Sequence, residues 1–160
     1  MLTVKIINYN NINECINILK RNNDDFNFFK NIGWSDRQFK YQLNGQHNHS
    51  LGLWYNDTLI AFIVGNIMSV KKKLEYEIFI IYVDNKYRNN RYATLLIKAI
   101  ANYPYSLKLN RIALEVSESN IAAINLYKKC NFDLIGKRNN YYSFNNVKEN
   151  ALIFEKKINK

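Results

Sequence analysis

A strand pattern that runs into a polar loop and then a helix constrains the fold of this chain more than any other segment. Residues 74–83 read Leu-Glu-Tyr-Glu-Ile-Phe-Ile-Ile-Tyr-Val, which predicts a strand buried on both faces near the middle of a sheet. Apolar side chains then recur at helical spacing over residues 94–103. The loop between these elements turns successive backbone N–H groups toward one point, and the helix N-terminus adds positive potential there, so together they predict an anion site sized for a pyrophosphate.

The remaining segments continue this mixture of strand and helix patterns. One loop is predicted after residue 21, and a second loop, rich in tyrosine, is predicted between the last two strands. Ser35 is the expected N-cap of a short helix. The order of elements predicts the α/β class with a mixed sheet, and the absence of repeats and linkers predicts a single domain over residues 1–160. The other predicted strands are 2–7, 51–55, 58–67, 111–116, 132–137 and 151–157, and the other predicted helices are 11–21 and 121–129.

Composition limits the class of partner and of site. The formal net charge of +10 attracts acidic partners, but the basic residues are scattered, so a solvated basic surface is as good an explanation as a nucleic-acid site. Two distant cysteines and no recognisable signal peptide predict a cytoplasmic protein. No apolar run is long enough to span a membrane. His47 and His49 have no cysteine or carboxylate beside them at zinc-site spacing, so no metal is expected.

Two segments resemble one enzyme family. The loop reads Arg88-Asn89-Asn90-Arg91-Tyr92-Ala93 and is followed by Leu95-Leu96. It is similar to the Arg/Gln-x-x-Gly-x-Gly/Ala element of the GNAT acetyltransferases, with Arg91 where the family has glycine. Residues 114–132 hold Leu-Glu-Val, then Ser-Asn-x-x-Ala, then Leu-Tyr and a final Phe, as the family does, with Asn131 in place of a glycine.

Two shorter segments are similar to one branch of that family. Residues 34–39, Trp-Ser-Asp-Arg-Gln-Phe, resemble an element of the RimI-type ribosomal-protein-alanine acetyltransferases, and residues 138–142, Arg-Asn-Asn-Tyr-Tyr, resemble another. The resemblance implies a GNAT fold, with a mixed, mostly antiparallel sheet of six to seven strands flanked by about four helices. It also implies acetyl-CoA as cosubstrate and transfer of the acetyl group to an amine, most simply the N-terminal amine of a protein such as a ribosomal protein. Neither membrane association nor direct nucleic-acid binding is expected.

The resemblance assigns roles to individual residues. Glu115 would be the general base, and its alternative is a carboxylate in a salt bridge at a strand edge. Tyr127 would be the general acid, and its alternative is a tyrosine of the core. A third set would line the acceptor groove, or else pack as ordinary aromatic residues: Trp34, Phe39, Tyr141 and Tyr142. The expected cofactor-binding residues are Ile81, Tyr82, Val83, Arg88, Asn89, Asn90, Arg91, Tyr92, Ala93, Thr94 and Asn120.

Three functions compete at this stage. The first is N-terminal acetylation of a protein, for which Glu75, Glu77, Glu115 and Glu118 could form an acidic groove that accepts a basic substrate. The second is acetylation of a small amine by the same fold. The third is a ribosome- or RNA-binding module with a degenerate cofactor loop, suggested by Arg91 and the charge of +10.

Overall fold

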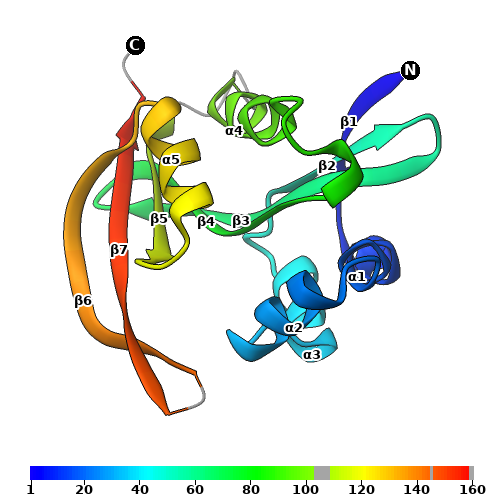
Figure 1. Ribbon diagram of the computed structural model, residues 1–160. Coiled ribbons are helices and arrows are strands. Elements are labelled where there is room, and N and C mark those ends of the chain that lie inside the picture. The colour runs from blue at the N-terminus through cyan, green and yellow to red at the C-terminus, as the bar shows by residue number, and fades with distance from the viewer. Residues whose placement is uncertain (103–108, 145, 159–160) are drawn as a thin grey trace.

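The structure is a computed structural model that describes residues 1–102, 109–144 and 146–158 (Figure 1). Its helices and strands follow the chain as an α/β arrangement. Two short 3-10 helices are η1 (Tyr9–Asn11) and η2 (Asn85–Tyr87). The α-helices are α1 (Ile12–Lys20), α2 (Asn23–Asn31), α3 (Asp36–Leu43), α4 (Tyr92–Asn102) and α5 (Ile121–Lys129). The strands are β1 (Leu2–Ile7), β2 (Ser50–Tyr55), β3 (Thr58–Val70), β4 (Lys73–Val83), β5 (Leu109–Ser117), β6 (Asp133–Phe144) and β7 (Val147–Lys157).

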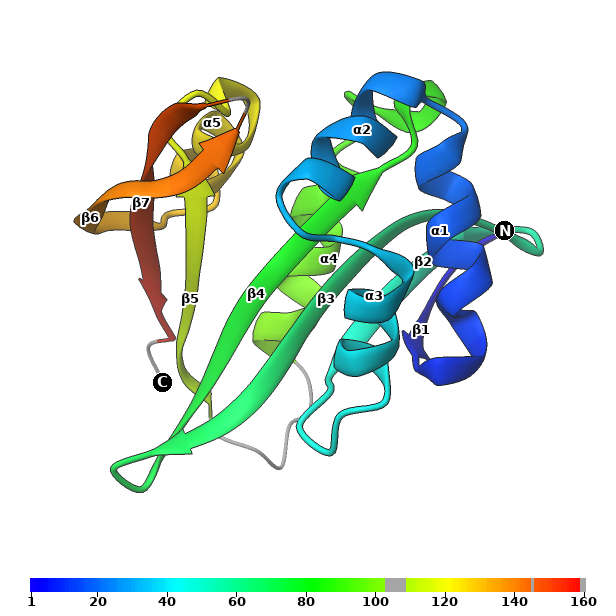
Figure 2. The same cartoon turned by 90° about the horizontal axis from the view of Figure 1, so that it is seen from below.

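The strands form one seven-stranded sheet in the order β1-β2-β3-β4-β5-β7-β6. Every neighbouring pair is antiparallel except β4 and β5, which are parallel. Helices α1 to α3 cover one face of β1 to β4, and α4 lies behind the same strands (Figure 2). The face of β5, β6 and β7 that is turned toward the viewer in Figure 2 is left uncovered by the described helices. The mixed sheet confirms the predicted fold class.

The two parallel strands separate halfway along their length. Pairing of β4 with β5 runs from Leu74↔Leu109 to Ile78↔Leu114 and then stops, although β4 continues to Val83. Figure 2 shows the two strands diverging from this point. Because β4 is no longer paired with β5 beyond Ile78, its backbone groups on that side are free to bind another molecule.

Two hydrophobic clusters fill the two faces of the sheet. One packs α4 and α5 against the sheet around Tyr76, Ile112 and Phe154, and the other packs α1 and α3 around Ile7, Phe39 and Phe62. Strand β4 contributes to both clusters because side chains alternate between faces. The register of β3 and β4 shifts between Val64 and Gly65, which shows that the local pairing is irregular at the point where β4 approaches the separation.

Gly65 sits at this irregularity with no room for a side chain. A Cβ atom there would lie 2.3 Å from the Glu77 carbonyl oxygen and 2.5 Å from the Tyr76 ring. We expect Gly65→Ala to lower the free energy of unfolding by about 3 kcal/mol or more, because backbone and a buried ring must both move. Chemical denaturation measures this. The matched control is Gly136→Ala, whose Cβ would meet Ile153 at 3.4 Å, and a similar loss in both variants would contradict the steric explanation.

Two parts of the fold differ from the sequence-based expectation. The predicted loop after residue 21 contains the helix α2, begun by Asn22, whose side chain accepts a hydrogen bond from the Asp25 backbone N–H. The predicted tyrosine-rich loop is also wrong, because β6 and β7 extend through it as a long hairpin. Residue 103 of the predicted helix 94–103 and residue 145 lie outside the described residues.

Candidate active site

The larger of two cavities opens where β4 and β5 separate and has a volume of about 1010 Å³. Its walls are the end of β4, the loop that leads into α4, one face of α5 along its whole length, and one side of α2. Ten of the eleven residues expected to bind the cofactor line this cavity: Ile81, Tyr82, Val83, Arg88, Asn89, Arg91, Tyr92, Ala93, Thr94 and Asn120.

The eleventh residue, Asn90, holds the loop in shape. Its side-chain amide donates to the backbone carbonyls of Tyr87 at 3.1 Å and Arg88 at 3.0 Å. The neighbouring residues Asn89 and Arg91 have left-handed backbone conformations, with φ of 65° and 61°. Asp84 begins the turn by accepting from the backbone N–H of Lys86 at 3.1 Å. The loop is therefore a compact, internally bonded turn that ends at the N-terminus of α4.

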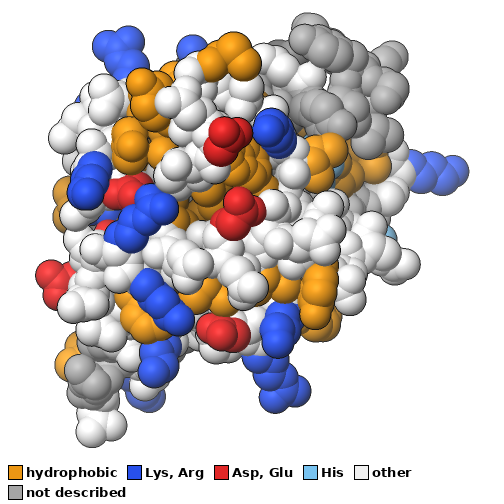
Figure 3. All heavy atoms as spheres, turned by 90° about the vertical axis from the view of Figure 1, so that its right-hand side faces the viewer, with side chains coloured by type: hydrophobic (Ala, Val, Ile, Leu, Met, Phe, Trp, Pro, Cys, Tyr) orange, Lys and Arg blue, Asp and Glu red, His pale blue; other side chains and the backbone are white. Residues whose placement is uncertain are grey.

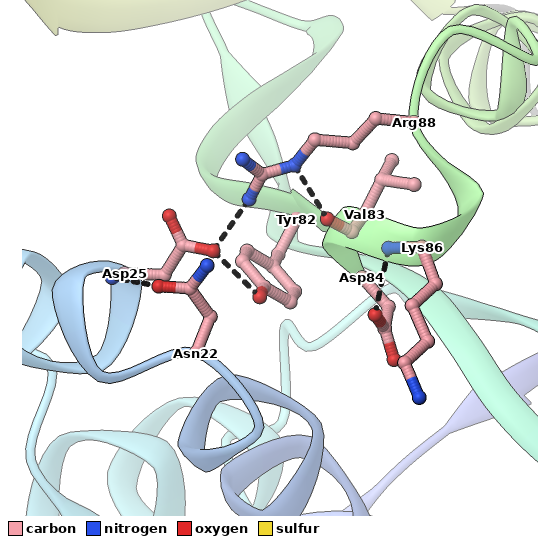
Figure 4. A network of polar contacts seen from close by, with 7 residues as sticks. All are labelled: Asn22, Asp25, Tyr82, Val83, Asp84, Lys86 and Arg88. Atoms are coloured by element: carbon pink, nitrogen blue, oxygen red, sulfur yellow. Dashed lines mark hydrogen bonds and ion pairs between the residues drawn. The ribbon is translucent and has the colours of Figure 1, made fainter.

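A network of polar contacts joins this loop to α2 (Figure 4). The Arg88 guanidinium lies 2.5 Å from the Asp25 carboxylate, and its Nε donates to the Val83 carbonyl at 3.1 Å. The Tyr82 hydroxyl donates to the same Asp25 oxygen at 2.9 Å. Partial burial, followed by the hydrogen bond and the charge of Asp25, raises the pKa of Tyr82. Asp25 thus lies in the cavity wall with its negative charge already neutralised.

Sequence reasoning missed several residues of the cavity wall. Asp25, Phe28 and Phe29 come from α2, which was expected to be a loop. Asn125 and Lys129 come from α5, one helical turn apart and on the face that begins at Ala122. Helical spacing could have found the α5 residues, because Asn120 was already the expected cap, and the structure shows its side chain accepting from the Ala123 backbone N–H.

Glu115 lies on β5 beside the separation and is held in a polar cluster. Its carboxylate is 2.9 Å from Arg138 Nε, and its side chain is 20% exposed. The Tyr141 hydroxyl hydrogen-bonds to Glu115, and the charge of Glu115 is the largest of the causes that raise the pKa of Tyr141. Arg138 also stacks on the Tyr141 ring at 5.4 Å. The salt bridge anticipated as the alternative role for Glu115 is present, and it fixes the carboxylate in place while leaving it accessible to solvent.

Tyr127 lies on α5 and is 5% exposed. Its ring packs against Phe132 at 5.6 Å and Phe154 at 6.2 Å. Its hydroxyl forms no hydrogen bond with any other described residue. Burial, together with the nearby Tyr142 and Cys130, raises the pKa of Tyr127, so the phenol stays protonated well above neutral pH. Tyr127 is part of the core and also keeps a proton that it could donate.

The second cavity has a volume of about 580 Å³ and lies between α2 and the β6–β7 hairpin. Phe28 and Ser119 line both cavities, so the two are adjacent. Tyr141 and Tyr142 line it as expected, and burial is the main cause that raises the pKa of Tyr142 to about 12. The other two residues expected in the acceptor groove do not line either cavity. Trp34 and Phe39 are 9% and 1% exposed and pack together in the core beside Phe62.

The family model described as Acetyltransferase (GNAT) matches residues 16–132 of the chain. The chain belongs to the GNAT family. A Haemophilus ducreyi protein, [Ribosomal protein bS18]-alanine N-acetyltransferase, is 32% identical over 114 residues, which are 69% of this chain and 76% of that protein.

The structural comparisons agree with this family. The ribosomal-protein-S18-alanine N-acetyltransferase from Escherichia coli superposes with a TM-score of 0.83 at 24% identity, covering 100% of this chain and 96% of that one. Arabidopsis thaliana NAA60 in complex with acetyl-CoA superposes with a TM-score of 0.82 at 19% identity, covering 100% of both chains. The family model and the Haemophilus ducreyi relative show that this GNAT protein is an acetyl-CoA-dependent acetyltransferase, and the solved structures show that it has the fold predicted from the sequence.

The larger cavity of this GNAT enzyme has groups that suit acetyl-CoA. The unpaired side of β4 at Ile81 to Val83 can bond the amides of the pantetheine chain, and the α4 N-terminus, which has no acidic residue in its first turn, can receive the phosphates. Acetyl-CoA supplies an acetyl group activated as a thioester. No group of three His, Cys, Asp or Glu in the described part of the chain is arranged to hold a metal. No described helix of this GNAT protein could span a membrane.

Four carboxylates of this GNAT protein lie on one face of β4, β5 and β7, and one of them, Glu115, bonds to Tyr141 of the second cavity. This acidic strip consists of Glu75, Glu77, Glu115 and Glu155, at alternating positions of paired strands. Arg111 bridges Glu75 at 2.8 Å and Glu155 at 3.0 Å, and Arg138 pairs with Glu115. Lys157 lies 4.0 Å from Glu155 on the same face, so four carboxylates and three cations leave an excess of one negative charge. The Lys and Arg side chains on the face shown in Figure 3 are instead spread over the surface.

The charges of the strip predict how a substitution of Glu77 changes the thermal stability of the protein. Burial and the charge of Glu115 raise the pKa of Glu77, and Arg138 partly offsets them. A carboxyl whose pKa is higher when folded contributes stability below its unfolded pKa and loses it as the pH rises through the folded pKa. At neutral pH the ionised Glu77 therefore opposes folding, and we expect Glu77→Gln to raise Tm slightly at pH 7.

Thermal unfolding of Glu77→Gln should also be measured near pH 4, where the gain in Tm should shrink because less of the parent Glu77 is ionised. The matched control is Asp57→Asn, an exposed carboxylate in the turn between β2 and β3, whose effect on Tm should be near zero at both pH values. A gain at Glu77 that is equal at both pH values would contradict the electrostatic cause.

Proposed function

We propose that this GNAT enzyme acetylates the N-terminal amine of a basic protein, such as a ribosomal protein. The observation that carries the proposal is the acidic strip beside the second cavity, on a chain whose net charge is +10. A basic N-terminal segment would be repelled by most of the surface and attracted here, because complementary charge steers association. The ribosomal substrate in the name of the Haemophilus ducreyi relative supports the same acceptor.

The proposed acceptor site uses the second cavity. Tyr141 and Tyr142 form an aromatic wall on one side, and Phe28 and Ile32 of the α2 segment face it. The cavity adjoins the acetyl-CoA cavity at Phe28 and Ser119, so an amine held here would reach the thioester. Residues after the N-terminus would extend over the uncovered face of β5 and β7, along the acidic strip.

We assign the proton transfers to two residues. Glu115 accepts the proton that the amine loses, directly or through one water molecule, and Arg138 and Tyr141 keep its carboxylate oriented. Tyr127 provides the proton taken up by the sulfur when the carbon–sulfur bond breaks, since burial keeps its phenol protonated. The new bond joins the amine nitrogen to the acetyl carbon. The products are an acetylated N-terminus and free CoA.

Release of free CoA thiol from acetyl-CoA tests the proposal. The substrate is an alanine-initial peptide with several Arg and Lys residues, and the controls are the same peptide with a blocked N-terminus and one with Ala in place of the basic residues. We expect release with the first peptide, none with the second, and a higher KM with the third. Turnover confined to polyamines or aminoglycosides would replace the proposed acceptor with a small amine.

A further inference from the structure

The loop that leads into α4 carries two arginines, and their surroundings differ. We propose that Arg91 is the side chain that binds the cofactor phosphates, and that Arg88 is a positioning residue that ties α2 to the loop and neutralises Asp25. This division of labour concerns acetyl-CoA alone and is independent of which amine accepts the acetyl group.

Arg88 already uses its donors within the protein. One terminal nitrogen is paired with Asp25 at 2.5 Å, Nε donates to the Val83 carbonyl at 3.1 Å, and the guanidinium lies over the Tyr82 ring at 5.6 Å (Figure 4). To bind a phosphate through these donors, Arg88 would have to leave Asp25 as an unpaired carboxylate in the same cavity wall. That carboxylate would repel the phosphates, so Arg88 favours cofactor binding most by staying where it is.

Arg91 has the opposite surroundings. Arg91 is one of the residues that line the cavity, and its exposed side chain forms no hydrogen bond or ion pair with another described residue. Its φ of 61° lies in the left-handed region, which is unfavourable for residues other than glycine. The similar element of the GNAT acetyltransferases has glycine at this position. Strained conformations persist where function or surroundings maintain them, and they cluster at ligand sites. The strain at Arg91 is explained if the guanidinium contributes to binding.

The opposite wall of the cavity supports this assignment. Lys129 of α5 lines the cavity together with Arg91 of the loop, so cations stand on two walls around the α4 N-terminus. Asp25 is the one acidic side chain among the lining residues, and it is paired with Arg88. The field in the cavity is therefore positive at the loop, where phosphates of the cofactor would lie.

Calorimetric titration of the full chain with two ligands tests the assignment. Acetyl-CoA carries all the phosphates, and S-acetyl-pantetheine carries none. We expect Arg91→Gly to weaken acetyl-CoA binding roughly tenfold and to leave S-acetyl-pantetheine binding unchanged, because one charge-assisted contact is lost. Arg91→Lys should recover part of the affinity. Thermal stability should not fall in Arg91→Gly, since glycine adopts this backbone conformation freely.

Two controls separate local contact from net charge and from loop position. Lys98→Gln removes one positive charge from the exposed side of α4 and should leave both affinities unchanged. The double variant Asp25→Asn, Arg88→Gln removes the tie without changing the net charge, and it should weaken both ligands by the same factor. A loss confined to acetyl-CoA in this double variant, or no such loss in Arg91→Gly, would overturn the assignment. Neither the titration with acetyl-CoA nor the one with S-acetyl-pantetheine needs an acceptor amine, so their outcome is separate from that of the peptide experiment.

Discussion

Replacing Glu115 with glutamine is expected to lower kcat for the basic peptide by about 10²- to 10⁴-fold, the usual contribution of a general base. Glutamine keeps the size of the side chain and can still accept a hydrogen bond from Tyr141, but it cannot take up the amine proton. It also leaves Arg138 without its ion pair. The Kd for acetyl-CoA should change little, because Glu115 does not line the larger cavity.

The control for this variant is Glu118→Gln. Glu118 is a nearby carboxylate that accepts hydrogen bonds from the backbone and side chain of Asn150, and it has no place in the proposed proton transfers. We expect its kcat to stay within a few-fold of the parent. Equal activity in Glu115→Gln and the parent enzyme would show that the amine loses its proton elsewhere, and the salt bridge with Arg138 would then be the whole role of Glu115.

Local pattern was sufficient to predict the central part of this fold. The buried character of residues 74–83 indicated a central strand, and β4 covers Lys73–Val83. The spacing of apolar residues over 121–129 indicated the helix that α5 occupies, with Asn120 as its cap. These features depend on neighbours within about four positions, which the sequence displays directly. The cavity-lining loop was found for the same reason.

Elements whose stability depends on distant partners were not found. Helix α2 reads Asn-Asp-Asp-Phe-Asn-Phe-Phe-Lys-Asn, and most of these residues have low helix propensity. Besides its Asn22 cap, the helix depends on its packing and on its contacts with β4 and the loop. Asp25 meets Arg88 across 63 positions of sequence. The β6–β7 hairpin likewise extends through a segment rich in Asn and Tyr because each strand satisfies the backbone of the other.

The aromatic residues show the same limit of local pattern. Trp34 and Phe39 were grouped with Tyr141 and Tyr142 as possible walls of an acceptor groove, since aromatic side chains serve equally in cores and in grooves. Their position relative to the sheet decides between the two. Trp34 and Phe39 belong to the hydrophobic cluster that packs α1 and α3 against the sheet. Tyr141 and Tyr142 instead line the second cavity from the β6–β7 hairpin.

Tyr127→Phe is expected to separate a chemical role from a structural one. We expect kcat to fall by about 10²-fold or more, because the departing sulfur loses its proton donor. The Tm should stay the same, since phenylalanine keeps the ring packing against Phe132 and Phe154 and the Tyr127 hydroxyl bonds to no other described residue. Acetyl-CoA affinity should also be retained, because phenylalanine keeps the ring and the proposed contact of the hydroxyl with the sulfur matters only as the carbon–sulfur bond breaks.

The parent enzyme should keep its activity on the alkaline side well past the ordinary tyrosine pKa of 10, since burial raises the pKa of Tyr127 and preserves the proton that it donates. Tyr142→Phe is the matched comparison. It removes a second phenol with a raised pKa from the acceptor side, so it should raise KM for the peptide more than it lowers kcat. If Tyr127→Phe kept both kcat and Tm, the tyrosine would be a core residue only, and the sulfur would take its proton from solvent.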